Sequence, residues 1–551
     1  MTDWNFADVF ELCAEVRGER PALVNGETVV SWADFDRRAA GLATALLSAG
    51  LGHQAKVAQY LYNCNEYLES VFAAEKAAMV PVNTNYRYED NELLYLWDNA
   101  DAEAVVFHGA FSERVDRLRH HLPGVKLWLW VDDGSGPRPD FALDYEEAAA
   151  SLPAGASSRV EGPWGRSGDD LYFLYTGGTT GMPKGVMWRQ DDLFNLLNDG
   201  SVLRLPVEEG VEAARALLES MQDSPPVLLP ACPLMHGTGA FTAYTGLAIG
   251  GTVVTMPGRS FDPVAVLDAV SRHRVNVLTI VGDSFAKPLL RELDGAEPGR
   301  HDLSSIFAMI SSGVMWSEEA KRALLRHAPQ MMLVDAFSSS EALGMGASVS
   351  SAGSEAHTAS FRLGPFAKVI DDEGNEVKPG SGVAGRLALG GRLPVGYYKD
   401  EAKTASTFLT IDGVRYSVPG DYAMVEEDGT LTLLGRGSVC INTGGEKVFP
   451  EEVEEVLKTH PAVLDAACVG VPDERFGEAI TAVVQLRPEE AASPEELVHH
   501  VRGRLAAYKA PRNVLFVESI GRSPSGKLDY SGLKSLARER VGAGAGAVRP
   551  D

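Results

Sequence analysis

Short, nearly continuous apolar runs alternate with amphipathic segments through the first three-quarters of the chain. Runs of this kind are typical of strands in a sheet that is covered on both faces. Between them lie helical patterns such as FDPVAVLDAVSRHRV. The alternation predicts a layered α/β fold for a large N-terminal domain. The predicted strands are residues 57–61, 104–108, 126–131, 251–256, 276–281 and 331–337.

The end of the chain predicts a smaller α+β domain. PEEVEEVLKTH (450–460) has proline at its first helical position and acidic residues in its first turn, both typical of a helix start. SPEELVHHVRGRL begins with a capping box formed by Ser493 and Glu496. ITAVVQL and NVLFV are expected strands. We place the boundary near 435–438, which gives a large domain of residues 1–435 and a small domain of residues 439–551.

Size and charge narrow the classes of function. A chain of 551 residues exceeds the size of a single hydrophobic core, so at least two domains are expected. The net charge of −26 disfavours nucleic acid as a partner. The five cysteines form no CxxC pair, which disfavours a zinc site, and a sparse, odd set suits the reducing cytoplasm. We expect no secretory leader and no integral membrane segment.

The strongest chemical signal is LYFLYTGGTTGMPKGVMW (171–188), where an apolar strand enters a loop rich in glycine and threonine. Glycines let backbone N–H groups close around phosphate oxygens, threonine hydroxyls add donors, and Lys184 adds a positive charge. The spacing is not that of a Walker A loop. We expect the loop to join two strands, with a helix starting near Asp191. A hairpin without a ligand is the alternative.

The loop resembles that of the adenylate-forming superfamily, which includes acyl-CoA synthetases, luciferases and peptide-synthetase adenylation domains. Further motifs occur in the family's order: PLMHG (233–237), SSGV (311–314), DAFSSSE (335–341), VPGD (418–421) and SPSGK (523–527). The resemblance implies that ATP is bound by Thr176, Gly177, Gly178, Thr179, Thr180, Gly181, Lys184, Gly313, Asp335, Ala336, Phe337, Ser340, Asp421 and Arg436.

Two of these motifs carry specific expectations. In DAFSSSE the chain departs from the family's usual Tyr-Gly-x-Thr-Glu, but it keeps an aromatic ring, a hydroxyl at Ser340 and the acid Glu341, which the resemblance makes a catalytic residue and an Mg²⁺ ligand. A surface glutamate is the alternative for Glu341. Asp421 is expected to accept hydrogen bonds from the ribose hydroxyls, with Arg436 assisting. A Pro-Gly-Asp triplet is also common in plain turns.

The resemblance implies two reactions: a carboxylate attacks ATP to give acyl-AMP and pyrophosphate, and the thiol of coenzyme A then displaces AMP. Lys527 would bridge the carboxylate and the α-phosphate in the first step, although an exposed turn lysine is the alternative. The small domain is expected to be mobile about a hinge at 436–438, with Ser438 at the matching position. Gly444 and Gly445 would then meet the pantetheine arm of CoA, or else form a plain turn.

Several segments, among them GMPKGVMWRQDDLF and VCINTGGEKVFPEEVE, are similar to actinobacterial acyl-CoA synthetases related to steroid side-chain ligases. We therefore expect an apolar acid, either a steroid side-chain acid or a medium- or long-chain fatty acid. Alternatives are transfer of the acyl group to a carrier protein and a catalytically silent nucleotide-binding scaffold. The oligomeric state stays open, with a homodimer as one form. The residues expected at the acyl pocket are Met235, His236, Gly237, Val281 and Val314, and His236 is also expected to act in catalysis. Ordinary core packing is the alternative for the apolar residues, and a buried histidine with satisfied hydrogen bonds is the alternative for His236.

Overall fold

The computed structural model describes residues 3–153, 155–178, 181–201, 203–221, 224–314, 316–353, 358–443, 446–473, 476–522 and 528–542. The chain divides into two compact units, Met1–Thr358 with Gly390–Leu409, and Ala359–Leu389 with Thr410–Asp551. This division follows contacts within each unit. The domain boundary and hinge expected at 436–438 stay predictions.

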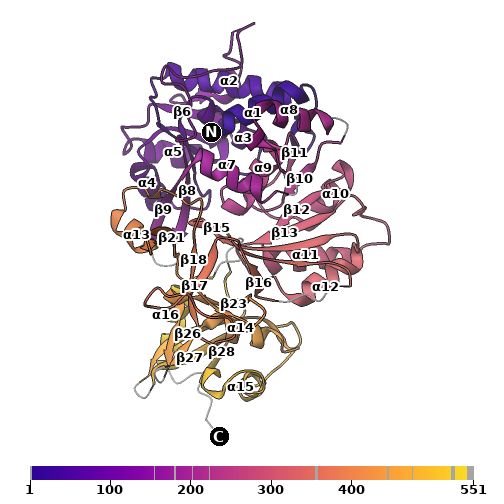
Figure 1. Ribbon diagram of the computed structural model, residues 1–551, viewed down its shortest axis with the longest axis vertical. Coiled ribbons are helices and arrows are strands. Elements are labelled where there is room, and N and C mark those ends of the chain that lie inside the picture. The colour runs from indigo at the N-terminus through magenta and orange to yellow at the C-terminus, as the bar shows by residue number, and fades with distance from the viewer. Residues whose placement is uncertain are drawn as a thin grey trace. The chain divides into compact units, whose positions relative to one another are not determined.

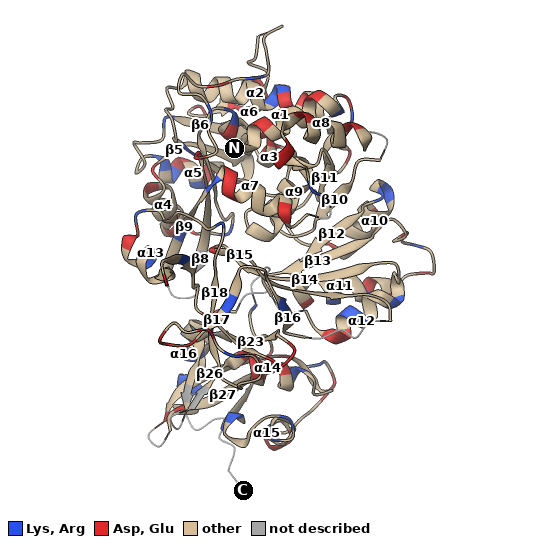
Figure 2. Ribbon diagram, in the orientation of Figure 1, with Lys and Arg blue, Asp and Glu red and all other residues tan. Residues whose placement is uncertain are grey.

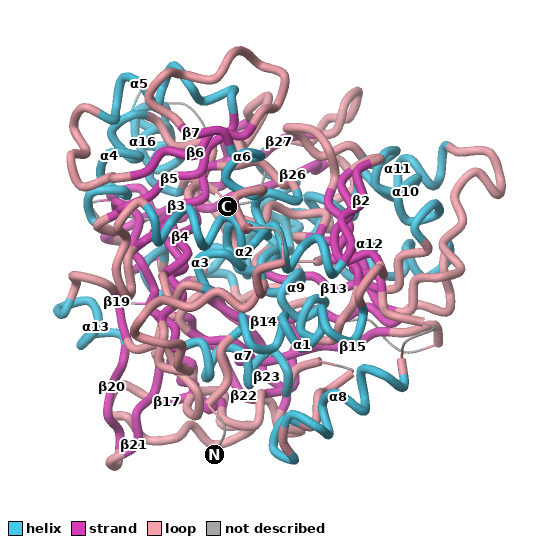
Figure 3. Tube along the Cα trace, turned by 90° about the horizontal axis from the view of Figure 1, so that it is seen from above, coloured by secondary structure: helices cyan, strands magenta, loops and turns pink. Residues whose placement is uncertain are grey.

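The first unit contains a sheet with the strand order β19-β9-β8-β4-β3-β5-β6-β7. Strands β8, β4, β3, β5, β6 and β7 pair in parallel, whereas β9 and β19 add antiparallel partners at one edge. Figure 3 shows strands β3, β5, β6 and β7 as neighbours. The strands span β3 Lys56–Tyr60, β4 Val80–Asn83, β5 Ala102–His108, β6 Leu127–Val131, β7 Leu143–Asp144, β8 Leu171–Gly178, β9 Gly181–Arg189 and β19 Gly396–Tyr397.

A second set of strands in this unit follows the order β2-β1-β11-β10-β12-β13-β14-β15. Strands β1, β11, β10, β12, β13 and β14 pair in parallel, and β2 and β15 run antiparallel to their neighbours. Their bounds are β1 Pro21–Asn25, β2 Thr28–Ser31, β10 Val227–Pro230, β11 Thr252–Thr255, β12 Val277–Ile280, β13 Ala308–Ser312, β14 Met332–Ser339 and β15 Ala342–Ser350. All six strands predicted from apolar runs are therefore confirmed.

Helices of the first unit lie along these strands (Figure 1). The main ones are α1 Phe6–Arg17, α2 Trp32–Ser48, α3 Asn65–Lys76, α4 Asp90–Asn99, α5 Ser112–Arg119, α6 Tyr145–Ala149, α7 Gln190–Asp199, α8 Val211–Ser220, α9 Gly237–Ala248, α10 Pro263–His273, α11 Gly282–Gly295, α12 Glu318–His327 and α13 Glu401–Thr407. Acidic residues occur on several of these helices, including α7 and α8 (Figure 2), so the negative charge is not confined to one helix.

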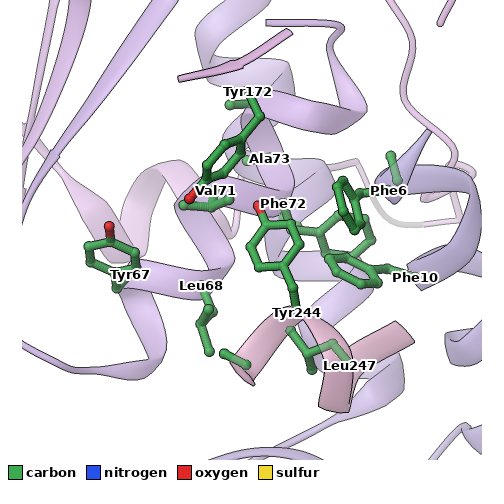
Figure 4. Close-up of a cluster of buried hydrophobic side chains, with 14 of the residues drawn as sticks. Phe6, Phe10, Tyr67, Leu68, Val71, Phe72, Ala73, Tyr172, Tyr244 and Leu247 are labelled. Carbon is green, nitrogen blue, oxygen red and sulfur yellow. The ribbon is translucent and has the colours of Figure 1, made fainter. Parts of the chain in front are cut away.

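An aromatic cluster joins α1, α3 and α9 to strand β8 (Figure 4). The ring of Phe6 meets that of Tyr244 edge-on with centroids 4.5 Å apart, and Phe10 meets Phe72 in the same manner at 5.3 Å. Among these apolar groups lies Glu75, whose Oε1 accepts a hydrogen bond from the Tyr244 hydroxyl at 2.5 Å. Glu75 is fully buried, and this burial raises its pKa to about 8. The carboxyl group is thus held neutral within the core.

The described part of the second unit contains strands of two sheets. In one, the strand order is β16-β23-β22-β18-β21-β20, with β17 paired to β18. In the other, the order is β25-β24-β27-β26, and β28 joins β27 in parallel. The bounds are β16 Ser360–Leu363, β17 Ala367–Ile370, β18 Gly385–Leu389, β20 Phe408–Ile411, β21 Val414–Ser417, β22 Asp421–Val425, β23 Thr430–Arg436, β24 Ile441–Thr443, β25 Glu446–Val448, β26 Val463–Asp473, β27 Gly477–Leu486 and β28 Asn513–Phe516.

Helices α14 Pro450–Lys458, α15 Pro494–Arg502 and α16 Tyr530–Gly542 accompany the second of these sheets. The predicted capping box of α15 is confirmed, since Ser493 N donates to Glu496 Oε2 at 2.7 Å and Glu496 N donates to Ser493 Oγ at 3.2 Å. One apolar cluster of this sheet includes residues of α14 and α15, and another includes residues of α16. The predicted α+β character of the C-terminal region is therefore confirmed.

The five thiols differ in their surroundings. Cys13, Cys64, Cys232 and Cys468 are buried, whereas Cys440 is partly exposed. Burial raises the pKa of Cys13 and of Cys232 to about 12, and it raises the pKa of Cys64 and of Cys468 well above the ordinary range. These four groups therefore stay protonated at neutral pH.

Candidate active site

The glycine- and threonine-rich loop joins two antiparallel strands, as predicted. Strands β8 and β9 pair with Thr176 opposite Lys184 and Gly178 opposite Gly181. A side chain at Gly185 would collide with the ring of Tyr175, because a Cβ there would lie 2.7 Å from that ring. The helix expected near Asp191 is α7, which begins at Gln190. Thr179 and Thr180 lie outside the described residues, and Gly177 is placed here by its strand alone.

A short segment around β19 brings the predicted phosphate lysine and the predicted metal ligand to one place. Tyr397 pairs with Val186 of β9. Its hydroxyl donates to Glu341 Oε1 at 2.7 Å. Three residues later, Asp400 forms an ion pair with Lys184. The segment 396–400 therefore contacts both Lys184 and Glu341, which are far apart in sequence and are both expected at the nucleotide.

The turn between β14 and β15 carries the rest of the DAFSSSE motif. Ser340 and Glu341 form this turn, and the indole N–H of Trp188 on β9 donates to the carbonyl oxygen of Ser340 at 3.1 Å. Ala336 and Phe337 lie earlier in the motif, within β14, where they pair with Ala347 and Gly346 of β15. The phosphate hairpin and the DAFSSSE motif are thus neighbours in the structure.

Asp335 has a partner that the sequence did not indicate. Its carboxylate accepts a hydrogen bond from the ammonium of Lys321 on α12, with Nζ and Oδ2 2.8 Å apart. Both side chains are buried. Burial raises the pKa of Asp335, and the Lys321 charge opposes this effect. The pair ties β14, which carries the predicted ATP-binding residues Ala336 and Phe337, to α12.

The PLMHG and SSGV motifs meet at the start of α9. His236 immediately precedes this helix. Gly313, which follows β13, has φ of +91°, a conformation that favours glycine. A Cβ at Gly313 would lie 3.8 Å from the hydroxyl of Thr238, in the first turn of α9. A Cβ at Gly237 would lie 3.2 Å from Leu174 of β8, which places this turn close to the strand of the phosphate loop.

The remaining predicted pocket residues are apolar and mostly buried. Met235 is 2% exposed and Val281 is 7% exposed, and Val314 packs against the same hydrophobic cluster as Val281. Asp283, whose role the sequence leaves open, accepts hydrogen bonds from the backbone N–H and the hydroxyl of Ser317, at 2.9 and 3.0 Å. Since Ser317 caps α12, Asp283 joins the start of α11 to the start of α12.

In the second unit, Asp421 and Arg436 are opposite each other across β22 and β23. The role of both residues at the ribose stays a prediction. Ser438 lies in a short turn, Gly437–Val439, that follows β23. The predicted CoA-contacting residues Gly444 and Gly445 and the predicted catalytic Lys527 lie outside the described residues.

Sequence reasoning missed several side chains that contact the motif residues or their neighbours. Lys321, Tyr397 and Asp400 are described above, and Asn83 donates to the carbonyl oxygens of Tyr175 and Met235. Asn83 follows an apolar run, and a polar residue at the carboxyl end of a buried parallel strand is a signal that could have found it. Lys321 lies in an ordinary amphipathic helix, where no sequence pattern separates it from a solvated lysine.

Comparison with known families defines the class of protein. A model described as AMP-binding enzyme matches residues 10–398, and one described as AMP-binding enzyme C-terminal domain matches residues 452–527. The chain belongs to the AMP-binding enzyme family. The predicted resemblance and the predicted fold class, a large α/β region followed by a smaller C-terminal one, are confirmed.

The most similar relatives include CoA ligases of actinobacteria. The chain is 41% identical to a medium/long-chain-fatty-acid–CoA/3-oxocholest-4-en-26-oate–CoA ligase of Mycolicibacterium smegmatis, over 97% of both chains. It is also 41% identical to a 3-oxocholest-4-en-26-oate–CoA ligase of Rhodococcus rhodochrous, over 96% of this chain and 95% of that one. The predicted likeness to actinobacterial fatty-acid and steroid ligases is confirmed.

Solved structures agree in fold. The anthranilate CoA ligase AuaEII in complex with anthranoyl-AMP superposes with a TM-score of 0.83 at 21% identity, covering 98% of this chain and 99% of that one. ATP-bound MatB from Rhodopseudomonas palustris gives a TM-score of 0.78 at 25% identity, covering 97% and 99%. Within the described part of the chain, no helix combines the length and apolar character needed to cross a bilayer.

Proposed function

We propose that this chain is an acyl-CoA ligase that activates an apolar carboxylic acid with ATP. The predicted enzyme class, an acid–thiol ligase, is confirmed by the AMP-binding family and by relatives that are CoA ligases over nearly their whole length. The observation that carries the chemistry is the segment 396–400, which holds Lys184 through Asp400 and Glu341 through Tyr397. It contacts a cation of the hairpin expected to bind phosphates and holds a carboxylate beside that hairpin.

The first reaction joins two anions, so fixed positive charge and hydrogen-bond donors must carry much of the catalysis. A carboxylate oxygen of the acid attacks the α-phosphorus, a C–O–P bond forms, and the bond to the β-phosphate breaks to release pyrophosphate. Lys184 and the hairpin N–H groups hold the phosphates of the nucleotide. Lys527 is proposed to steady the attacking carboxylate and the α-phosphate, and His236 lies where the acid meets the nucleotide.

The second reaction transfers the acyl group. The sulfur of coenzyme A attacks the acyl carbonyl carbon, the bond to the AMP oxygen breaks, and AMP leaves. Gly444 and Gly445 are proposed to admit the narrow pantetheine arm, after a movement about Ser438. The cytoplasm as location and the homodimer as assembly stay predictions.

A magnesium ion carried by ATP fits the residues present. Glu341 is partly exposed and offers a carboxylate oxygen beside the hairpin. Among the described residues no group of three or more His, Cys, Asp or Glu side chains is arranged to hold a metal. Mg²⁺ is usually bound by one or two carboxylates together with substrate phosphates and water, and a single carboxylate here meets that requirement. The ion would neutralise phosphate charge in the first reaction.

We propose that the acid is a steroid side-chain acid or a medium- or long-chain fatty acid. The names of the relatives and the apolar surroundings of Met235 and Val281 support this choice. Pyrophosphate release with a panel of acids tests it. A higher kcat/KM for a steroid side-chain acid than for palmitate is expected, and the reverse order would remove the steroid preference while leaving the ligase chemistry intact.

The two-step chemistry is tested with Lys527→Ala. We expect pyrophosphate release from acid and ATP to fall by about 100-fold or more, because a charge aimed at the reacting phosphate is lost. Formation of the thioester from supplied acyl-AMP should largely survive. Lys534→Ala, which removes a lysine of α16 that is paired with Glu478 of β27, is the matched control. Equal loss of both steps in Lys527→Ala would contradict the role, and acyl transfer to a carrier protein in place of CoA would favour the rival function.

A further inference from the structure

One buried amide is bonded to two of the motif-bearing segments. Asn83 is the last residue of β4 and is 5% exposed. Its Oδ1 accepts a hydrogen bond from Tyr175 N at 2.6 Å. Its Nδ2 donates to Tyr175 O at 2.8 Å and to Met235 O at 2.7 Å. Both N–H groups and the oxygen of the amide are therefore used.

The two bonds to Tyr175 take the place of a backbone pair between β4 and β8. Strands β4 and β8 pair in parallel, with Val82 opposite Phe173. Strand β8 continues toward the phosphate loop, while β4 ends at Asn83. The side-chain amide of Asn83 takes the N–H and the C=O of Tyr175, which would otherwise need other partners inside the protein. The strand is thus held in line up to the residue before Thr176.

The third bond reaches a different segment. Met235 directly precedes His236, just as Tyr175 directly precedes Thr176. One side chain is therefore bonded to the residue before the phosphate loop and to the residue before the histidine expected at the acid. Another asparagine, Asn63, holds Cys232 O and Leu234 N, at 3.1 and 2.8 Å. These two bonds reach Leu234 of PLMHG and the residue that precedes this motif, and neither reaches β8.

We propose that Asn83 is a positioning residue that keeps the acid-facing segment at His236 in register with the phosphate hairpin. This role rests on the proposed ligase function. The first reaction requires a carboxylate oxygen and a phosphorus atom at attack distance, and a misplacement of about 1 Å can lower a rate by about 100-fold. A single amide that spaces the two segments sets this distance directly.

The chemistry of the amide explains why asparagine is needed. An aspartate of the same shape would lose both donors and would direct negative charge at the carbonyl oxygens of Tyr175 and Met235. An alanine would leave three backbone groups without these partners in a buried place. Neither change alters a residue that is expected to touch ATP or the acid.

The test compares Asn83→Asp with Gln59→Glu in the full-length protein. Gln59 is a fully buried amide on the neighbouring strand β3, and its Oε1 accepts from Val82 N at 3.1 Å. Both substitutions change a buried amide to an acid, but Gln59 contacts neither motif segment through this bond. We expect kcat for pyrophosphate release to fall by about 100-fold in Asn83→Asp, with the KM for ATP much less affected, because alignment and not binding is lost.

Coupling to His236 separates positioning from general damage. In a His236→Ala background the further loss caused by Asn83→Asp should shrink to a few-fold, because the histidine to be positioned is absent. Additive losses, or a kcat per folded molecule equal to that of Gln59→Glu, would overturn the proposal. If Asn83→Asp does not fold, Asn83→Ser replaces it in the test, because serine places no charge in the core. Its kcat should also fall, but by less than that of Asn83→Asp. Failure of the wild-type protein to release pyrophosphate with any acid would instead contradict the ligase function itself.

Discussion

Glu75 and Glu341 each accept a hydrogen bond from a tyrosine hydroxyl, yet the two pairs lie in opposite surroundings. Glu75 meets Tyr244 in the aromatic cluster of α1, α3 and α9 (Figure 4), where burial raises its pKa to about 8. Glu341 meets Tyr397 in a turn that is partly exposed, beside the phosphate hairpin. The contact is the same, but the surroundings differ: burial keeps the Glu75 carboxyl neutral, whereas the partly exposed turn leaves Glu341 open to the cation proposed for it.

The largest expected effect is on the pH dependence of folding, and it concerns Glu75. Its pKa in the folded protein, about 8, exceeds the ordinary value of 4.5 expected when unfolded. The contribution of the Glu75 proton to the free energy of unfolding is complete below about pH 4.5 and is lost as the pH rises toward 8. In this range the unfolded chain releases a proton that the folded protein retains. Linkage gives a slope of up to about 1.4 kcal/mol per pH unit in this window.

Urea unfolding at several pH values measures this effect. Glu75→Gln keeps a neutral amide of similar shape, so the free energy of unfolding of the variant should exceed that of the wild type increasingly as the pH rises from 5 to 8. Parallel curves for the two proteins would show that Glu75 titrates normally in the fold.

The next effect concerns catalysis at Glu341. Glu341→Gln should lower kcat/KM for pyrophosphate release by about 100-fold, because a carboxylate that can hold Mg²⁺ against phosphates is lost. The thermal midpoint should barely change. Glu75→Gln is the matched control, since the same chemical change in the core should leave kcat/KM near the wild-type value. A similar loss of activity in both variants would contradict the division between the two pairs.

Removal of the core hydroxyl should have a smaller effect. Tyr244→Phe leaves the Glu75 carboxyl without its donor in a buried place, which should lower the free energy of unfolding by about 1–2 kcal/mol. Chemical denaturation measures this loss. Activity per folded molecule should stay close to that of the wild type, and a selective loss of kcat would show that the cluster serves catalysis.

The smallest effect is expected from Tyr397→Phe. The hydroxyl orients Glu341, but water can replace it in a partly exposed turn, so we expect a rise of only a few-fold in the apparent KM for ATP at limiting Mg²⁺. Excess Mg²⁺ should restore the wild-type value. A loss as large as that of Glu341→Gln would mean that the tyrosine hydroxyl takes part in the chemistry itself.

Much of the fold was predictable because its signals are local. Apolar runs gave the strands, and proline with first-turn acids gave α14. The order of motifs gave the family. The partners of the motif residues were not predictable in the same way, because Asp400 and Lys184 are 216 residues apart and Tyr397 and Glu341 are 56 apart. Such pairs depend on how strands are ordered in a sheet, and single-residue patterns do not record that order.

Asp283 is a second case in which the partner of a residue could not be predicted from the sequence. Asp283 lies two residues after Val281, which is expected at the acyl pocket, and the sequence assigns it no role. The structure shows its carboxylate bound to Ser317 and paired with Lys287, so it serves the junction of two helices. A polar residue near a site can therefore belong to the scaffold, and its hydrogen bonds distinguish the two cases.

The uneven burial of the five cysteines has a practical consequence. Four thiols are shielded and protonated, whereas Cys440 is partly exposed and lies two residues after Ser438. A maleimide dye should therefore attach first at Cys440 without removal of any native cysteine. Its emission, recorded while ATP, acid and coenzyme A are added in turn, would report on the chain next to the expected hinge during the catalytic cycle.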